Sequence, residues 1–154
     1  MSQINKSARQ VLAPILSNKR VGQYHQIIVS VGDIAAQCKP GNFVAISVGG
    51  DSSRMVLRRA FAISRVSTSS TVGGTMELIV APHGQGSKWL CAQGEGVTLD
   101  IVAPLGTAFG IPTEPVPVLL ERDFNIPQLS ELEKEVKHLE QRCSTIWSKK
   151  HATA

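Results

Sequence analysis

An arginine and an aromatic ring stand two residues apart in the segment LRRAFAIS, which covers residues 57–64. Side chains at i and i+2 of a β-strand point to the same face, so Arg59 and Phe61 would lie side by side. A planar guanidinium can bind a pyrophosphate with paired hydrogen bonds, and an aromatic ring offers a surface for stacking. The pair indicates a ligand with both a phosphate and a flat ring, although a basic strand with a core phenylalanine also explains it.

A glycine-rich turn that opens a short helix is the second motif. Residues 81–90 read APHGQGSKWL and directly follow a strand-like run. Glycines let backbone N–H groups approach a ligand closely, and a helix N-terminus favours an anion. We expect Ser87 to act as the N-cap or to donate its hydroxyl to a phosphate. An ordinary capped turn is the alternative, with His83 as a solvated loop residue.

These motifs need strands that bring them together, and short runs rich in Val, Ile and aromatic residues occupy much of the chain. The runs are residues 22–31, 42–48, 56–64, 75–81 and 97–102. A further strand within 9–19 is restricted by Pro14 to an edge or a bulge. Six short strands with tight turns, the Ser/Thr/Gly run 67–74 among them, and a single short helix at 87–92 predict an antiparallel Greek-key barrel over residues 1–114.

The pattern changes near Pro115, and residues 115–154 are expected to form a linker and one amphipathic helix. Over 129–147 the apolar residues recur at alternating spacings of three and four, as in a coiled coil. Parallel self-pairing would place Glu135 opposite Glu140 of the second helix. Self-association and docking in cis against the barrel therefore both remain open.

Composition limits the class of protein. The net charge is +4 over 154 residues, with Arg54, Arg58, Arg59 and Arg65 in one short segment. Such a cluster suits a polyphosphate or a nucleic-acid backbone. Only seven aromatic residues are present (four Phe, two Trp, one Tyr), too few for the stacking platforms of nucleic-acid barrels, so nucleic acid is disfavoured.

Location and metal chemistry are also constrained by the sequence. No stretch approaches the roughly 20 apolar residues of a membrane span, and the polar N-terminus lacks a secretory core, so we expect a cytoplasmic protein without membrane contact. Cys38, Cys91 and Cys143 are widely spaced, which indicates neither a disulfide framework nor a metal site.

Together, LRRAFAIS, APHGQGSKWL and GEGVTLDIVAPLGTAF (94–109) resemble the flavin domain of the electron-transfer subunit of dihydroorotate dehydrogenase, within the ferredoxin-reductase-like group. The resemblance covers roughly residues 10–112 and implies FAD binding. It implies an arginine on the pyrophosphate, neighbours along the isoalloxazine, contacts from the next strand end, and a Gly-Ser pair on phosphate. The corresponding cofactor-binding residues are Arg59, Ala60, Phe61, Ala62, Ile79, Val80, Ala81, Gly86 and Ser87. None is expected to be catalytic.

In that family, NADH reduces FAD, and electrons then pass through a [2Fe-2S] centre to an FMN-containing catalytic subunit of pyrimidine biosynthesis. This sequence departs from the family at Ala62, where serine is common, and at Val80-Ala81, where Tyr-Arg is common. After residues 116–120 no glycine-rich nicotinamide turn follows, and no four-cysteine set for the cluster exists. We therefore expect a truncated, fused or frame-altered form of such a subunit, inactive by itself.

Two functions from different classes follow. The first is an FAD-binding electron-transfer module, with binding weakened by Ala62 and Ala81. The alternative is a non-catalytic barrel that has lost FAD and acts in assembly through its C-terminal helix.

Overall fold

The computed structural model describes residues 8–50, 53–71, 73–110, 116–117 and 127–151. The chain divides into two compact units, Met1–Phe109 and Gly110–Ala154. The first unit carries all seven strands of the described residues, and the second carries the long helix. The expected domain boundary, between residues 114 and 115, lies in a stretch of the chain that the structure does not describe.

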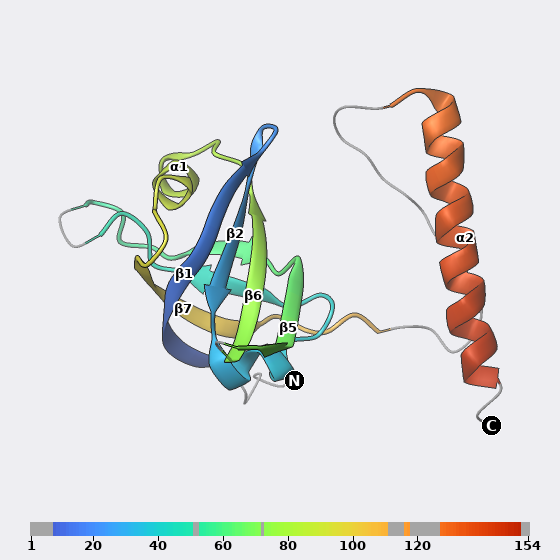
Figure 1. The fold of residues 1–154 in the computed structure, drawn as a ribbon, viewed down its shortest axis with the longest axis horizontal. Coiled ribbons are helices and arrows are strands. Elements are labelled where there is room, and N and C mark those ends of the chain that lie inside the picture. The colour runs from blue at the N-terminus through green and yellow to red at the C-terminus, as the bar shows by residue number, and fades with distance from the viewer. Residues whose placement is uncertain (1–7, 51–52, 72, 111–115, 118–126, 152–154) are drawn as a thin grey trace. The chain divides into compact units, whose positions relative to one another are not determined.

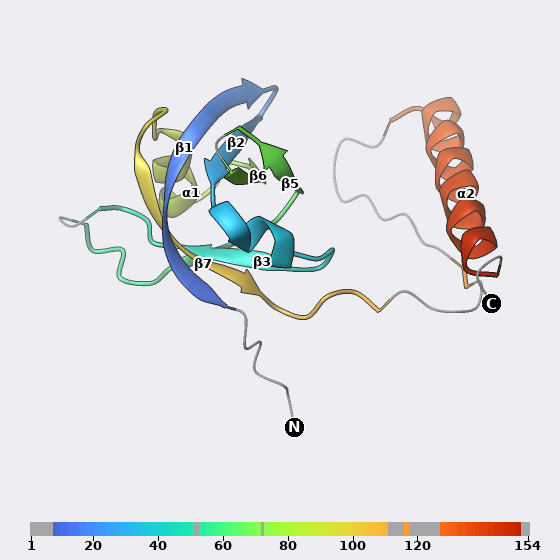
Figure 2. The same ribbon diagram turned by 60° about the horizontal axis from the view of Figure 1, so that its bottom comes forward.

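The first unit is an antiparallel sheet that curves around a common interior, with a short helix at one end (Figures 1 and 2). Its elements in chain order are β1 (Arg9–Val21), β2 (Tyr24–Ser30), the 3₁₀ helix η1 (Gly32–Gln37), β3 (Phe43–Ile46), β4 (Arg59–Ala62), β5 (Arg65–Ser70), β6 (Gly73–Val80), α1 (Gln85–Cys91) and β7 (Thr98–Leu105). The strand order is β4-β3-β7-β1-β2-β6-β5, and every neighbouring pair is antiparallel.

The two edges of this sheet are joined by one continuous segment. β4 pairs with β3, and β5, which begins three residues later, pairs with β6. At the crossing point, the N–H of Ile63 donates to the carbonyl of Asn42 and the N–H of Ser64 donates to that of Glu77. These two hydrogen bonds connect the two ends of the strand order at this point. The expected antiparallel barrel is confirmed.

The strand count differs from the expected six. The Ser/Thr/Gly run was expected to be a turn, but β5 extends through residues 65–70 and β6 begins at Gly73. Serine and threonine pair adequately in a strand when a neighbouring strand supplies the ladder, here β6. Turn-forming composition was therefore misleading at this point.

Pro14 lies within a central strand, contrary to the expected edge. β1 pairs with β7 from Arg9 to Pro14 and with β2 from Ile15 onward, with an irregularity between Ile15 and Ser17. The N–H of Ile15 donates to Val97 of the β7 side, so the nitrogen of Pro14 points to the opposite side. On that side the pairing of β1 with β2 begins only at Ile15. The N–H group that proline lacks is therefore not needed for a hydrogen bond between these two strands. The expected bulge does occur, next to the proline.

The interior is filled by alternate residues of the strands, the period-two pattern of a sheet with one buried face. The largest fully buried side chains include Ile15, Ile27, Val29, Val44, Ile46, Met76, Leu78, Val80, Leu99 and Ile101. Leu90 of α1 joins them and is fully buried as well. This core holds the strand ends and α1 together.

The second unit contains α2 (Leu129–His151). The helix begins after Gln128, whose carbonyl accepts from the N–H groups of Glu131 and Leu132. Leu129 and Val136 of its apolar stripe are exposed, whereas Leu132, Leu139 and Cys143 are half-buried. Within the described part of the chain, no helix combines the length and apolarity needed to cross a bilayer.

Candidate functional site

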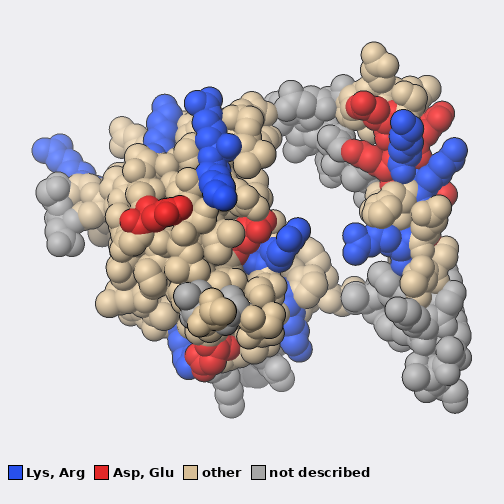
Figure 3. Space-filling view, in the orientation of Figure 1, with Lys and Arg blue, Asp and Glu red and all other residues tan. Residues whose placement is uncertain are grey.

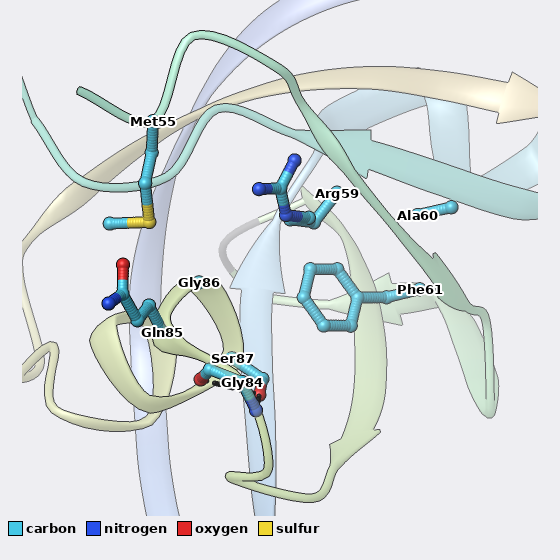
Figure 4. Close-up of a pocket in the computed structure, with 8 residues that line it drawn as sticks. All are labelled: Met55, Arg59, Ala60, Phe61, Gly84, Gln85, Gly86 and Ser87. Carbon is cyan, nitrogen blue, oxygen red and sulfur yellow. Dashed lines mark hydrogen bonds between the residues drawn. The ribbon is translucent and has the colours of Figure 1, made fainter. Parts of the chain in front are cut away.

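A cavity of about 330 Å³ lies between β4 and the turn that opens α1. Its walls come from three segments that are separate in sequence. The residues that line the cavity are Met55, Arg59, Ala60, Phe61, Gly84, Gln85, Gly86 and Ser87 (Figure 4). The two motifs identified in the sequence therefore face each other across one pocket.

Arg59 and Phe61 come from the same face of β4, as their spacing predicted. In the register with β3 they stand opposite Ile46 and Val44, two core residues. In Figure 4 the ring of Phe61 points toward the Gly84–Ser87 turn, whereas the stem of Arg59 passes next to Gly86 and its guanidinium is turned toward the side of Met55. Phe61 is half-buried and packs against the core, while Arg59 is exposed. The face of the sheet that carries the buried core residues therefore also carries, at the end of the barrel near α1, the side chains that form one wall of the pocket.

Gly86 makes the closest approach between the two motifs. A Cβ added at this buried glycine would lie 3.1 Å from Cγ and 3.4 Å from Nε of Arg59, and 3.1 Å from Cγ2 of Val48. Absence of a side chain therefore lets the backbone of the turn lie directly against the arginine. A phosphate held there could reach both the guanidinium and backbone N–H groups.

The guanidinium of Arg59 is only partly engaged. Its Nη1 donates to the carbonyl of Leu57 at 2.9 Å. No carboxylate among the described residues forms an ion pair with it. Arg59 therefore keeps donors for an anion in the cavity.

Ser87 does not act as the helix N-cap, because Gly84 occupies that position. Its hydroxyl accepts from the N–H of Gly84 and donates to the carbonyl of Gly84, both at 3.1 Å. These bonds shape the turn from within. Exposed His83 bonds through its backbone N–H to Ala81 and does not line the cavity.

Four of the nine sequence-predicted residues do not line the cavity, namely Ala62, Ile79, Val80 and Ala81. Val80 is 2% exposed and belongs to the core, so its side chain cannot reach a ligand at the surface. Ile79 is 47% exposed on the outer face of β6, opposite Gln26 of β2. Ala62 is exposed at the end of β4, and Ala81 is half-buried.

Met55 and Gln85 line the cavity but were not singled out in the sequence. The backbone N–H of Met55 donates to Oγ of Ser53. Gly49, with φ +95°, lies so close that a Cβ there would overlap Ser53 and lie 2.7 Å from Cε of Met55. Gly49 and Gly50 indicate a turn in the sequence. That this loop approaches α1 depends on the closed barrel, which the local sequence does not encode.

The remaining arginines of the cluster lie elsewhere. Arg58 donates to Oδ2 of Asp100 at 2.6 Å and to the Asp100 carbonyl at 2.9 Å. These bonds from Arg58, helped by Gln10 and opposed by partial burial, hold the pKa of Asp100 below its usual value. On the barrel face in Figure 3, basic and acidic groups are interspersed rather than joined in a basic track.

Metal binding has no evident place in the described part of the chain, where no three His, Cys, Asp or Glu residues cluster. All three cysteines are free thiols. Burial raises the pKa of both Cys38 and Cys91, which keeps these thiols protonated and unreactive at neutral pH.

Known structures place this fold in a class. The barrel is similar to a cytochrome P450 reductase from Amycolatopsis (TM-score 0.52, 16% identity, 69% of this chain and 31% of that chain). It is also similar to an NADH-dependent reduced ferredoxin–NADP oxidoreductase (TM-score 0.56, 20% identity, 68% and 36%). The fold is that of a ferredoxin-reductase-type FAD-binding barrel.

Curated relatives narrow the likeness. The chain is 30% identical over 108 residues to the electron transfer subunit of dihydroorotate dehydrogenase B (NAD(+)) from Fusobacterium nucleatum, covering 68% of this chain and 40% of that protein. The corresponding subunits of Listeria monocytogenes and Lysinibacillus sphaericus are 27% and 26% identical, over 71% and 83% of this chain. No family model matches.

The resemblance found in the sequence is thus confirmed. This chain spans 40% to 49% of the length of these relatives. Each of these relatives is an electron transfer subunit of dihydroorotate dehydrogenase B (NAD(+)), and the likeness is to a part of that subunit.

Proposed function

We propose that the first unit binds FAD in the pocket between β4 and α1 and serves as the flavin module of an electron-transfer system of the dihydroorotate dehydrogenase type. One observation carries the proposal: Arg59 and the Gly86–Ser87 peptide, 27 residues apart in sequence, line one cavity. Had the barrel placed them on opposite sides, the cofactor assignment would have no basis.

The residues present fit a flavin dinucleotide. Arg59 would bind the pyrophosphate, because a charged donor with no carboxylate partner among the described residues faces the cavity. Because position 86 is a glycine, the backbone of the turn lies directly against Arg59, so one diphosphate could reach both the guanidinium and backbone N–H groups of the turn. The ring of Phe61 would pack against the flat part of the cofactor. Bound FAD supplies redox chemistry that no side chain can.

Ala62 and the end of β6 contribute less than the resemblance implies. Ala62 lacks the hydroxyl common in the family, and the side chain of Val80 is inside the core. Contacts of the cofactor with Ile79, Val80 and Ala81 would then involve only backbone atoms or a surface outside the described cavity. These changes would weaken FAD binding rather than abolish it, because the phosphate contacts remain.

Flavin content is the direct test. The full chain, purified gently, is expected to show the visible absorbance bands of a flavin, or to bind added FAD in a fluorescence titration. A protein that stays colourless and shows no saturable binding would contradict the proposal and favour the non-catalytic assembly barrel. Riboflavin, which lacks the diphosphate, serves as the control ligand and is expected to bind far more weakly.

The electron relay forms the second part of the proposal. Hydride transfer requires a nicotinamide ring held against the flavin, and no described residue provides such a site near the cavity. We therefore expect little reduction of a dye acceptor by NADH with this chain as the sole protein. Turnover would be expected only with a nicotinamide-binding partner and a catalytic dihydroorotate dehydrogenase subunit, in the cytoplasm.

A further inference from the structure

A polar network beneath the C-terminal end of α1 lies outside the pocket. Asn18 of β1 donates its side-chain amide to the backbone carbonyls of Cys91 and Gln93, at 3.0 and 2.7 Å. Its Oδ1 lies 2.8 Å from Nδ1 of His25 on β2. Asn18 and His25 are half-buried and lie on the same face of the β1–β2 ladder, two residues out of register, because Asn18 pairs with Ile27 and His25 with Arg20.

The chemistry of the network allows one orientation. Both carbonyls can only accept, so the NH₂ group of Asn18 must face them. Oδ1 is then left to accept from His25, whose Nδ1 must carry a hydrogen. Each polar group of the asparagine therefore has a partner. A side chain of the same shape that lacks the two N–H donors could not make the hydrogen bonds to the carbonyls of Cys91 and Gln93.

Helix α1 needs such support. Its seven residues are too few to form a stable helix in water, and the last carbonyls of any helix lack partners within it. Fully buried Leu90 anchors one face of the helix, and Asn18 binds the carbonyl of its last residue and one just beyond. Gln93 adds a bond from its Nε2 to the carbonyl of Trp89, at 2.7 Å.

The opposite end of the same helix carries the wall of the pocket. Gly86 packs so closely on Arg59 that a single added carbon would touch it. A helix of seven residues is rigid and spans only about 10 Å, so a displacement at one end moves the other. Displacements of about 1 Å are enough to impair a preorganised site.

We propose that Asn18 and His25 are positioning residues: they hold α1 in place, so that the Gly84–Ser87 turn stays against Arg59 and the phosphate-binding side of the FAD pocket is preformed. The inference rests on the proposed FAD function for its binding readout. Its structural readout, the order of α1, does not depend on flavin.

The first test substitutes Asn18→Asp in the full chain. The carboxylate keeps the shape but presents acceptors to the carbonyls of Cys91 and Gln93. We expect the Kd for FAD to rise at least about tenfold, because two hydrogen bonds are lost. Amides of α1 that bond within the helix, such as those of Lys88 and Ala92, are expected to exchange hydrogen at least about tenfold faster, with β6 unchanged.

Gln26→Glu is the matched control. Gln26 lies on the outer side of β2, next to His25 in sequence and opposite Ile79, so the substitution makes the same charge change away from α1. It is expected to leave both the FAD affinity and the exchange of α1 within about twofold of the unsubstituted protein.

A second pair of variants covers the case in which Asn18→Asp does not fold. His25→Leu removes the donor to Oδ1 of Asn18, whereas His25→Gln supplies one from its amide. The leucine variant is expected to weaken FAD binding about three- to tenfold, and the glutamine variant to recover most of that loss.

The outcomes separate the two proposals. If the unsubstituted chain binds no flavin, the proposed function fails, and hydrogen exchange alone then decides the positioning role. Faster exchange of α1 in Asn18→Asp or His25→Leu supports that role. Equal exchange overturns it, as does unchanged flavin affinity in both variants when the unsubstituted chain binds FAD.

Discussion

Adjacent arginines at the start of β4 have different surroundings. Arg58 is bonded twice to Asp100, and its charge is compensated there. Arg59 points into the cavity and bonds only to the carbonyl of Leu57 among the described contacts. Alternation along the strand separates the two guanidinium groups, because successive side chains lie on opposite faces. Only Arg59 is placed to bind an anion in the pocket.

Arg59→Met tests that assignment. A hydrogen bond to a charged group contributes about 1.5–3 kcal/mol, so the Kd for FAD is expected to rise about 10- to 150-fold. Isothermal titration or fluorescence quenching measures the change. Arg65→Met, which removes an exposed charge on β5 outside the cavity, is the control and is expected to change the Kd less than about threefold. Equal effects from both variants would show only a general charge effect.

Gly86→Ala tests the close approach of turn and arginine. The new Cβ would press on Arg59 and Val48, which lowers FAD affinity, by about five- to tenfold if the arginine moves. Stability is expected to change by less than about 1 kcal/mol, because alanine's higher helix propensity offsets part of the crowding.

Gly94→Ala is the matched control, since a Cβ there meets nothing within 4 Å, its φ is not in the left-handed region, and Gly94 does not line the cavity. The two variants are compared by thermal unfolding and by FAD titration. Retained affinity in Gly86→Ala would mean that the cofactor does not use this approach.

Pairs of elements stabilise the scaffold on which the site is built. Asp100 of β7 is bonded by Gln10 of the neighbouring strand β1 and by Arg58, which precedes β4 on the other side of β3, and so links separate parts of the sheet. Because its pKa is depressed in the folded chain, Asp100 stabilises the fold at pH values above its unfolded pKa of about 3.9. That contribution is lost as the pH falls through the lower, folded pKa.

Arg58→Met is therefore expected to destabilise the barrel by about 1 kcal/mol at neutral pH, the upper range for a partly exposed pair. The difference from the unsubstituted protein should shrink toward zero as the pH falls through the lowered folded pKa of Asp100, because the carboxyl is then protonated in both folded proteins. Urea unfolding at several pH values measures it. A difference that does not depend on pH would assign the effect to lost packing of the arginine stem instead.

At the scale of the whole molecule, the described core and all residues of the cavity belong to Met1–Phe109. A chain of residues 1–110 is therefore expected to fold and to bind FAD with a Kd within about twofold of that of the full chain, because it keeps every contact of the site. Thermal unfolding and FAD titration of both lengths test this. A much lower Tm for the short chain would show that residues 111–154 support the barrel.

The same two chains address the role of α2. Self-association through the helix would give a concentration-dependent mass for the full chain only, measured by analytical ultracentrifugation. Docking in cis would leave both chains monomeric. Self-association and docking in cis both remain predictions. The heptad pattern favours self-association, and the repulsion between Glu135 and Glu140 in a parallel pair opposes it.

The strands and both motifs could be predicted from the sequence because they depend on local chemistry. Period-two burial in β2, β3, β6 and β7 follows the apolar residues directly, and the glycine-rich turn opens a short helix as expected, although the helix begins at Gln85 and not at Ser87. The amphipathic period of 129–147 likewise predicted α2. In these cases neighbours within a few residues determine the conformation.

Other features required the folded barrel. β5 was expected to be a turn, because its Ser/Thr composition is overridden by pairing with β6. Met55 lines the cavity only because the loop from β3 to β4 lies near the turn that opens α1, and no local pattern marks Asn18, since the carbonyls it binds lie more than 70 residues away. The sequence by itself determined which residues could bind phosphate and a flat ring. Only the tertiary structure decided that Arg59 and Gly86 meet, because a closed barrel brings strand ends together through contacts that no local pattern encodes.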